Sequence, residues 1–292
     1  MTGDRAVLIS GASTGIGLAA AQRFAQSGWD VWAGVRSDGD AERVGATDAN
    51  IRPVHLDVTD ESSVDAVVTE LRRERGDLGL DVLVNNAGTA HGGPLEFIAQ
   101  EEWHEQFEVN FFGVVRLTRE ALPLMRSAVD PRIIVIGSIS SRLGVPLLGP
   151  YVSSKHAVAG LCASLRRELA PSGPLVTLIE PGAVRTEIWP KAVETAARLE
   201  ADLPAEAIER YGDYIEAQKV HLRGGHHEGV PADHVARVIE SIVESAHPPA
   251  RRLVGRDAQI GGALGRIVPD RVMEALGRAI HRRALRQGTG AR

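Results

Sequence analysis

Cysteine is nearly absent from this sequence, since Cys162 is the only one among 292 residues. A scaffold held by internal disulfides is therefore excluded, and a reducing compartment is the natural setting. No apolar run approaches the ~18 residues that a membrane span needs. The first residues lead directly into an apolar strand and a glycine turn, without the apolar region of a signal peptide. We therefore expect a soluble, cytoplasmic protein.

The chain also lacks the positive charge that nucleic-acid binding requires. Its formal net charge is -5, which argues against nucleic acid as the main partner. The exception is 251–292, where ten Arg face three acidic residues, while the rest of the chain carries 23 basic against 35 acidic residues. We interpret the basic C-terminal extension, 256–292, as a solvated surface. Contact with a membrane surface or a partner is the less favoured alternative.

Short apolar segments alternate with helical patterns along most of the chain. Helical periodicity is clear in 15–27, 62–75 and 151–169, and in 103–125, where Pro123 should bend or end the helix. This alternation predicts a single α/β domain over 1–292, with a doubly wound parallel sheet and helices on both faces. The sheet should have about seven strands, which we place at 6–9, 31–35, 51–56, 81–84, 133–136, 176–179 and 252–254.

Residues 187–230 interrupt this alternation. The segment is polar, rich in alanine and helical in pattern, and it ends in Gly224-Gly225. An insertion after the carboxyl end of a strand lies where ligands bind in such sheets. We therefore predict a helical lid over the substrate, with the glycine pair as its hinge.

A glycine-rich turn joins the first strand to the first helix. Gly11 permits the tight turn, Gly15 lets the backbone approach a pyrophosphate, and Gly17 lets the helix pack close to the sheet. The helix N-terminus offers free N–H groups to phosphate oxygens. The turn favours a dinucleotide site, although a turn without ligand and the similar turn of S-adenosylmethionine binders are alternatives.

Several later motifs follow this turn in a characteristic order. They are Asp57-Val58, Asn85-Asn86-Ala87-Gly88, Asn110, Ser138, Tyr151-x-x-x-Lys155 and Pro181-Gly182. Together with Gly11-x-x-x-Gly15-x-Gly17, this series resembles the short-chain dehydrogenase/reductase family over about residues 5–190. The resemblance implies a Rossmann-type fold and an NAD(P)(H)-dependent oxidoreductase that transfers a hydride between nicotinamide and an alcohol or carbonyl carbon.

The resemblance also implies which residues bind the cofactor. They are Gly11, Ser13, Thr14, Gly15, Ile16, Gly17, Arg36, Asp57, Val58, Asn85, Ala87, Gly88, Tyr151, Lys155, Pro181, Gly182, Val184 and Thr186. The second strand ends at Val35, where an acidic residue would bind the ribose 2′-OH of NAD, and Arg36 follows. A guanidinium without a neighbouring carboxylate suits a 2′-phosphate, so we favour NADP(H) over NAD(H). Asp38 is the alternative acid if the strand ends later.

The spacing of Tyr151 and Lys155 places both side chains on one face of a helix. The sequence has only three Tyr and three Lys, so chance rarely produces this spacing. A free Tyr has a pKa near 10, and a cation about 4 Å away would lower that pKa by about three units. The resemblance assigns proton transfer to Tyr151, orientation of the substrate oxygen to Ser138, and a water relay from Lys155 to Asn110.

The substrate is the least determined feature of the sequence. The apolar run 145–148 precedes Tyr151, and the segment from 251 to 271 is similar to the 17β-hydroxysteroid and retinol dehydrogenase-like subgroup. Both favour a lipophilic alcohol or ketone such as a steroid- or retinoid-like molecule. The family resemblance also implies a homodimer or homotetramer.

An alternative function and a metal site were also considered. A regulator that senses the nucleotide without catalysis is the alternative function, but such proteins typically lose the Tyr or the Lys. We expect no metal site, because no spacing suggests one, and we interpret His91 as a solvated loop residue.

Overall fold

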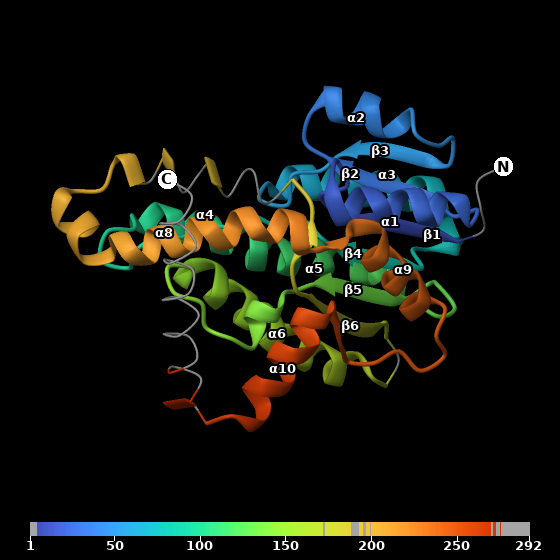
Figure 1. Ribbon diagram of the computed structural model, residues 1–292. Coiled ribbons are helices and arrows are strands. Elements are labelled where there is room, and N and C mark those ends of the chain that lie inside the picture. The colour runs from blue at the N-terminus through green and yellow to red at the C-terminus, as the bar shows by residue number, and fades with distance from the viewer. Residues whose placement is uncertain are drawn as a thin grey trace.

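A computed structural model of the chain describes residues 5–171, 173–187, 193–194, 197–198, 200–269, 271–272 and 275. Seven parallel strands form its main sheet in the order β3-β2-β1-β4-β5-β6-β9 (Figure 1). The strands are β1 (Ala6–Ile9), β2 (Asp30–Val35), β3 (Ile51–His55), β4 (Val82–Asn85), β5 (Arg132–Ile136), β6 (Leu175–Pro181) and β9 (Arg251–Val254). The predicted fold, a parallel sheet of seven strands with helices on both faces, is confirmed.

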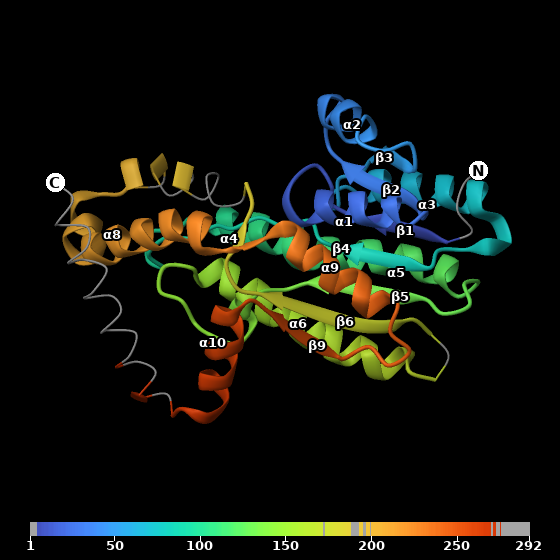
Figure 2. The same ribbon diagram turned by 45° about the vertical axis from the view of Figure 1, so that its right-hand side comes forward.

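Helices connect the strands and cover both faces of the sheet (Figure 2). They are α1 (Gly15–Gln26), α2 (Asp38–Gly45), α3 (Glu61–Arg75), α4 (Gln100–Phe107), α5 (Gly113–Met125), α6 (Gly149–Leu169), α8 (Ala205–Glu228), α9 (Ala232–Val243) and α10 (Arg256–Ile267). Short 3₁₀ helices lie at Gly76–Leu78 and Ile139–Ser141. Because both faces are covered, every residue of β1, β2, β4 and β5 is buried.

Two apolar cores lie on opposite faces of the sheet. One contains inward residues of α3, α5 and α6 together with Ala6 and Leu8 of β1. The other contains residues of α1 and α9 together with Val7 and Ile9. The side chains of β1 alternate between the two cores, as the twofold period of a strand requires. In α3, within the predicted helix 62–75, the apolar residues Val64, Val67, Val68 and Leu71 are buried at helical spacing.

The helix predicted over 103–125 is three elements rather than one. A π-helix at Glu108–Phe112 separates α4 from α5, and Pro123 lies inside α5 instead of ending it. Pro123 is in the last turn, where the loss of one N–H donor costs little of the remaining helix. A π-turn inside an α-helix is rare and is frequent at functional sites. Here it contains Asn110.

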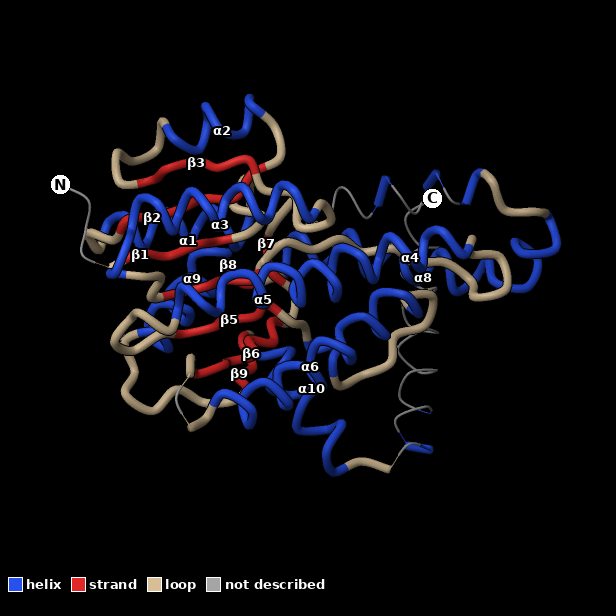
Figure 3. Tube along the Cα trace, turned by 180° about the vertical axis from the view of Figure 1, so that it is seen from behind, coloured by secondary structure: helices blue, strands red, loops and turns tan. Residues whose placement is uncertain are grey.

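The insertion begins and ends at a small second sheet. Its strands, β7 (Val184–Arg185) and β8 (Val230–Pro231), pair in parallel and bring the two ends of the segment together (Figure 3). From there α8 extends beyond the carboxyl end of the main sheet (Figures 1 and 2). The prediction of a hinge at Gly224-Gly225 was wrong, because α8 continues through these residues to Glu228. Residues 188–192 of the insertion, and most of the C-terminal extension after residue 269, lie outside the described residues.

Candidate active site

The glycine turn between β1 and α1 has the tight geometry that its sequence predicts. Gly11 and Gly15 have φ angles of 65° and 58°, in the left-handed region that glycine tolerates. A Cβ on Gly17 would lie 2.3 Å from the Gly11 carbonyl oxygen and 2.5 Å from the Asn86 side-chain nitrogen. Only glycine therefore allows α1 to approach the turn this closely.

Ser10 and Asn86 hold this turn, and neither was among the predicted site residues. The Ser10 hydroxyl oxygen accepts from the backbone N–H groups of Asn86 at 3.0 Å and Ala87 at 3.1 Å. The Asn86 amide donates back to the carbonyls of Ser10 at 3.0 Å and Gly11 at 2.9 Å. These four bonds join the glycine turn to the loop after β4. The two consecutive asparagines, Asn85 and Asn86, were the feature of the sequence that could have indicated this role.

The N-terminus of α1 fits a pyrophosphate. Its N-cap residue, Thr14, makes no side-chain capping bond, and the first turn holds no acidic residue. The first N–H groups of the helix are therefore available, and the helix dipole favours an anion there. A Cβ on Gly15 would lie 3.0 Å from the Thr186 methyl group, so the turn after β6 faces the glycine turn. Both turns therefore lie beside the N-terminus of α1.

Asn85, Asp57 and Val58 have structural partners of their own. The buried Asn85 amide donates to the Thr118 hydroxyl of α5 at 3.0 Å, so this side chain points into the core rather than toward the glycine turn. The Asp57 carboxylate accepts from the backbone N–H of Thr59 at 2.9 Å and from its hydroxyl at 2.7 Å. Val58 is buried. The loop after β3 is thus fixed by its own hydrogen bonds.

The end of β2 has the residues that the sequence analysis places there. The strand ends at buried Val35, and Asp38 is the first residue of α2, capped by the Ser37 hydroxyl. Arg36 is exposed, and its guanidinium has no hydrogen bond or ion pair within the described part of the chain. Its charge is therefore available to a ligand.

Asp257, at the start of α10, fixes the turn that follows β6. Its carboxylate accepts from the Ala183 N–H at 2.7 Å, and the Gly182 N–H donates to the Val254 carbonyl at 2.9 Å. A Cβ on Gly182 would lie 2.0 Å from the Asp257 carboxylate, so only glycine fits there. The sequence analysis missed Asp257, which comes 74 residues after its partner.

Tyr151 and Lys155 lie one turn apart on α6, beside the end of β5. The Lys155 Nζ lies 5.8 Å from the centroid of the Tyr151 ring and donates to the Ile136 carbonyl at 2.9 Å. Ser138, at the end of β5, is buried and hydrogen-bonded to the Tyr151 side chain. Its oxygen also accepts from the Ser140 N–H at 3.1 Å. The structure thus brings these three predicted catalytic residues together.

Burial controls the protonation of this pair. It raises the pKa of Tyr151 above its ordinary value, although the hydrogen bond from Ser138 opposes that shift. Burial also lowers the pKa of Lys155 to about 8. The direction for Tyr151 is opposite to the predicted one, because loss of solvent around the phenol outweighs the stabilisation of its anion. Tyr151 therefore holds its proton at neutral pH and can donate it.

Asn110, the fourth predicted residue, is buried within the π-helix and holds the backbone of Thr89. Its side-chain oxygen accepts from the Thr89 N–H at 2.9 Å, and its amide donates to the Thr89 carbonyl at 3.1 Å and the Ser154 hydroxyl at 3.2 Å. A Cβ on Gly88 would lie 3.4 Å from the Asn110 oxygen and 3.9 Å from the Lys155 Nζ. Asn110 and Lys155 therefore flank the same glycine.

Gln106 and His91 complete the loop after β4. The fully buried Gln106 accepts from the His91 N–H at 2.7 Å and donates to the Thr89 carbonyl at 2.9 Å. The interpretation of His91 as a solvated residue was wrong, because its ring pairs with Glu102 of α4 and is only 12% exposed. Glu105 lies beside this pair. The pair is eleven residues apart, which left no local signal in the sequence.

A doubly wound sheet with a dinucleotide turn, a Tyr–Lys pair and a serine at the end of β5 defines an oxidoreductase that uses a nicotinamide cofactor. The chain belongs to the short-chain dehydrogenase family, whose model, described as short chain dehydrogenase, matches residues 5–197.

The relatives of this chain match most of its length. The NADPH-dependent 3-dehydrocapnine reductase of Ornithobacterium rhinotracheale is 34% identical over 93% of this chain and 95% of its own. The 3-ketodihydrosphingosine reductase of Bacteroides thetaiotaomicron is 33% identical over 92% and 94%. A short-chain dehydrogenase/reductase from Burkholderia phymatum, solved in complex with NAD, superposes with a TM-score of 0.76 at 26% identity, over 91% and 92% of the two chains. Among the described residues, no helix is both long and apolar enough to cross a membrane.

Proposed function

We propose that this chain is an NADPH-dependent reductase that converts a ketone on a lipophilic molecule to a secondary alcohol. The observation that carries the proposal is the group formed by the buried Ser138 and Lys155 and the partly buried Tyr151. Its tyrosine keeps its proton at neutral pH, which suits an acid that protonates a carbonyl oxygen. The opposite reaction needs the same residue as a base and is favoured only at higher pH.

The bound nicotinamide would supply the hydride that adds to the carbonyl carbon. Tyr151 then gives its phenolic proton to the carbonyl oxygen, so that the alcohol forms without a free alkoxide. The Ser138 hydroxyl, which already contacts Tyr151, orients that oxygen. Lys155 is protonated below its pKa of about 8, and its positive charge stabilises the phenolate that Tyr151 becomes.

Asn110 supports this chemistry by fixing the loop that passes Lys155. Three hydrogen bonds tie its side chain to Thr89 and Ser154, and Ser154 in turn donates to the Tyr151 carbonyl at 2.8 Å. The side chain thus connects the loop after β4 to the helix that carries Tyr151. We propose positioning of this loop as its main role, in addition to the water relay that the family resemblance implies.

Arg36 and the glycine turn support the choice of NADP(H). No carboxylate stands at Val35, and the Arg36 guanidinium is exposed without a partner in the described part of the chain. A 2′-phosphate would find a charged donor in Arg36, and the strand end itself carries no acid that would repel it. The name of the Ornithobacterium relative also contains NADPH.

The surroundings of Tyr151 support a lipophilic substrate. Val145, Leu147 and Leu148 precede Tyr151 and are half-buried. The names of two relatives specify reductases of 3-dehydrocapnine and 3-ketodihydrosphingosine, and the second name specifies a ketone. A long apolar ketone therefore fits the proposal better than the narrower steroid- or retinoid-like class, which neither name mentions.

The insertion supports an enclosed site. Tyr211 of α8 donates to the Glu96 carboxylate in the segment after β4, and Arg210 lies 3.5 Å from the same carboxylate. The Phe97 and Tyr211 rings also pack edge to face, with centroids 6.2 Å apart. These contacts join α8 to the segment that leads into α4. We propose that 187–230 covers the substrate and that these contacts hold it in place.

The test measures the reduction of a short and a long methyl ketone with NADPH and with NADH. Each added methylene that becomes buried contributes about 0.8 kcal/mol. We therefore expect kcat/KM to rise by roughly threefold or more per methylene until the site is filled, and to be higher with NADPH. Equal kcat/KM for the short and long ketones would refute a lipophilic site. Faster turnover with NADH would refute the cofactor assignment.

A further inference from the structure

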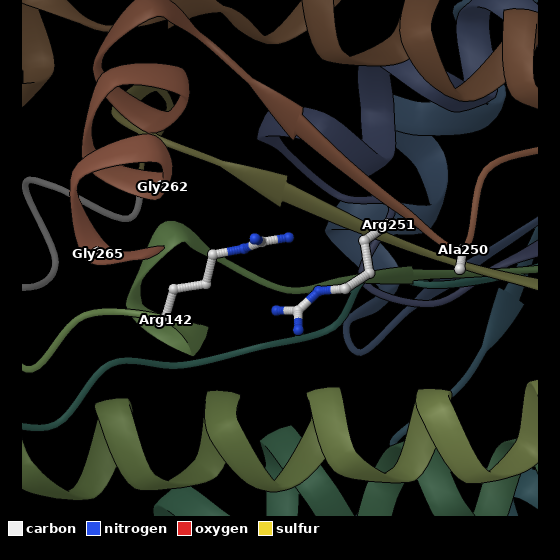
Figure 4. A pocket seen from close by; sticks show the side chains of 5 residues that line it. All are labelled: Arg142, Ala250, Arg251, Gly262 and Gly265. Carbon is white, nitrogen blue, oxygen red and sulfur yellow. The ribbon is translucent and has the colours of Figure 1, made fainter. Parts of the chain in front are cut away.

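A cavity lies at the edge of the sheet, between the loop that follows Ser138 and the elements β9 and α10. It has a volume of about 500 Å³ and is lined by Arg142, Ala250, Arg251, Gly262 and Gly265. Arg142 follows the 3₁₀ helix after Ser138, Arg251 begins β9, and both glycines belong to α10. Figure 4 shows the two guanidinium groups pointing toward one another across this cavity.

Both arginines share one buried carboxylate. Glu180 of β6 is fully buried, while the side chains of Arg142 and Arg251 are 17% and 38% exposed. The Nε atom of Arg142 lies 3.0 Å from both carboxylate oxygens, and the Nε atom of Arg251 lies 3.0 Å from one of them. The Ser141 hydroxyl adds a contact at 2.7 Å. Two cations and one anion leave a net charge of +1 at the cavity wall.

The arginines have more donors than Glu180 can accept. A guanidinium carries five N–H donors, and a carboxylate accepts about four hydrogen bonds. The Nε and Nη2 atoms of both arginines already face Glu180. Neither Nη1 atom has a hydrogen-bond partner among the residues that the structure describes. Two charged donor groups are therefore available to a molecule in the cavity.

The other residues that line the cavity, Ala250, Gly262 and Gly265, are small, and apolar side chains lie close to the two glycines. Cβ atoms on Gly262 and Gly265 would lie 2.7 Å from terminal methyl carbons of Leu253 and Leu143, so apolar side chains lie directly beside this part of α10. The cavity also lies where the basic C-terminal part of the sequence begins. Arg252 and Arg256, which are close to Arg251 in the sequence, are both exposed. Positive charge around a cavity raises the local concentration of anions.

We propose that this cavity binds a monovalent oxyanion, specifically a carboxylate with a short apolar tail, through the Nη1 groups of Arg142 and Arg251. A monoanion balances the net charge of +1, whereas a dianionic phosphate would leave excess negative charge beside the buried Glu180. A planar carboxylate also matches the donor geometry of guanidinium groups. The apolar tail would lie against the α10 side of the wall.

The test titrates butanoate into the full chain by isothermal titration calorimetry, without cofactor or substrate. Chloride and phosphate at matched ionic strength separate specific binding from screening. We expect saturable binding of butanoate that is tighter than that of phosphate and absent for chloride. No saturable heat with butanoate, or tighter binding of phosphate, would overturn the proposal.

Two variants at Ala250 keep the result interpretable. This residue is exposed and lines the cavity, so larger side chains there should not disturb folding. Ala250→Glu places an internal carboxylate against the arginines and should weaken butanoate at least tenfold. Ala250→Gln has the same size without the charge and should stay within about threefold of the original affinity. Equal binding by both variants would contradict an electrostatic site. Because ketone reduction is not measured, failure here leaves the proposed function unaffected.

Discussion

Replacing Asn110 with alanine tests whether this buried amide fixes the loop after β4. The change removes all three of its hydrogen bonds, two to Thr89 and one to Ser154. Two of the partners keep another bond: the Thr89 carbonyl still accepts from Gln106 at 2.9 Å, and the Ser154 hydroxyl still donates to the Tyr151 carbonyl. The Thr89 N–H loses its hydrogen-bond partner, and Asn110 is buried.

The expected loss of stability follows from the Thr89 N–H, which is left without a hydrogen-bond acceptor. A buried polar group without a hydrogen bond costs about 1–3 kcal/mol, and the deleted side chain also leaves a small cavity. We therefore expect the free energy of unfolding to fall by about 2–3 kcal/mol. For a chain of this size the melting temperature should fall by roughly 3–5 °C.

The assay compares denaturant and thermal unfolding of Asn110→Ala with those of Asn50→Ala. Asn50 is exposed, and its amide makes a 3.2 Å bond to the Ala25 carbonyl, so its loss should cost less than about 1 kcal/mol. Asn110→Ala should also bind NADPH more weakly, because Gly88 and Thr89 lose their support. An unchanged free energy of unfolding combined with lost turnover would refute the positioning role and leave only a chemical one.

Three further predictions concern the cofactor, the buried lysine and the glycine turn. Arg36→Ala should weaken NADPH by roughly ten- to hundredfold in fluorescence titrations and leave NADH nearly unchanged, since a charged hydrogen bond contributes about 1.5–3 kcal/mol; an equal loss for both would contradict the assignment. The pKa of Lys155 falls from 10.5 to about 8 in the folded chain, so the unfolded chain binds more protons between these values. Burial of this charge thus costs roughly 3 kcal/mol below pH 8, and that cost disappears as the pH rises to about 10.5. The stability advantage of Lys155→Met should therefore shrink over that interval, and a constant difference in urea unfolding would be the wrong outcome. Gly17→Ala should destabilise the chain by about 1–3 kcal/mol, because its Cβ would meet fixed atoms of the glycine turn. Gly160→Ala, in α6 with open space around its Cβ, should instead be neutral or stabilising by up to about 1 kcal/mol, and similar melting temperatures for the two variants would argue against the close packing.

The parts of the fold with strong periodicity could be predicted from the sequence. The apolar strands are buried on both faces, and α3 presents the apolar residues of its helical pattern to the core. The π-helix could not be predicted, because 108–112 continues the helical pattern on both sides of it. An extra residue per turn changes the hydrogen-bond pattern without changing the composition. Local periodicity therefore located this helix but not the turn that carries Asn110.

The candidate site shows the same division between local and distant information. Tyr151 and Lys155 share a helix, so their spacing was sufficient to pair them. Asp257 and its partner Ala183, in contrast, are brought together only by the pairing of β6 with β9. The pKa of Tyr151 depends on burial by several elements, which no spacing records, and this is why the predicted direction was wrong.

The most direct test of the proposed function is a single turnover of NADPH with a long-chain ketone, followed at the absorbance band of the reduced nicotinamide. The original chain should oxidise NADPH and yield the alcohol. Tyr151→Phe should bind NADPH with nearly unchanged affinity but react about 10²–10⁴ times more slowly, because only the proton donor is lost. If Tyr151→Phe keeps more than about a tenth of the rate, the phenol is not the acid and the account of this site is wrong.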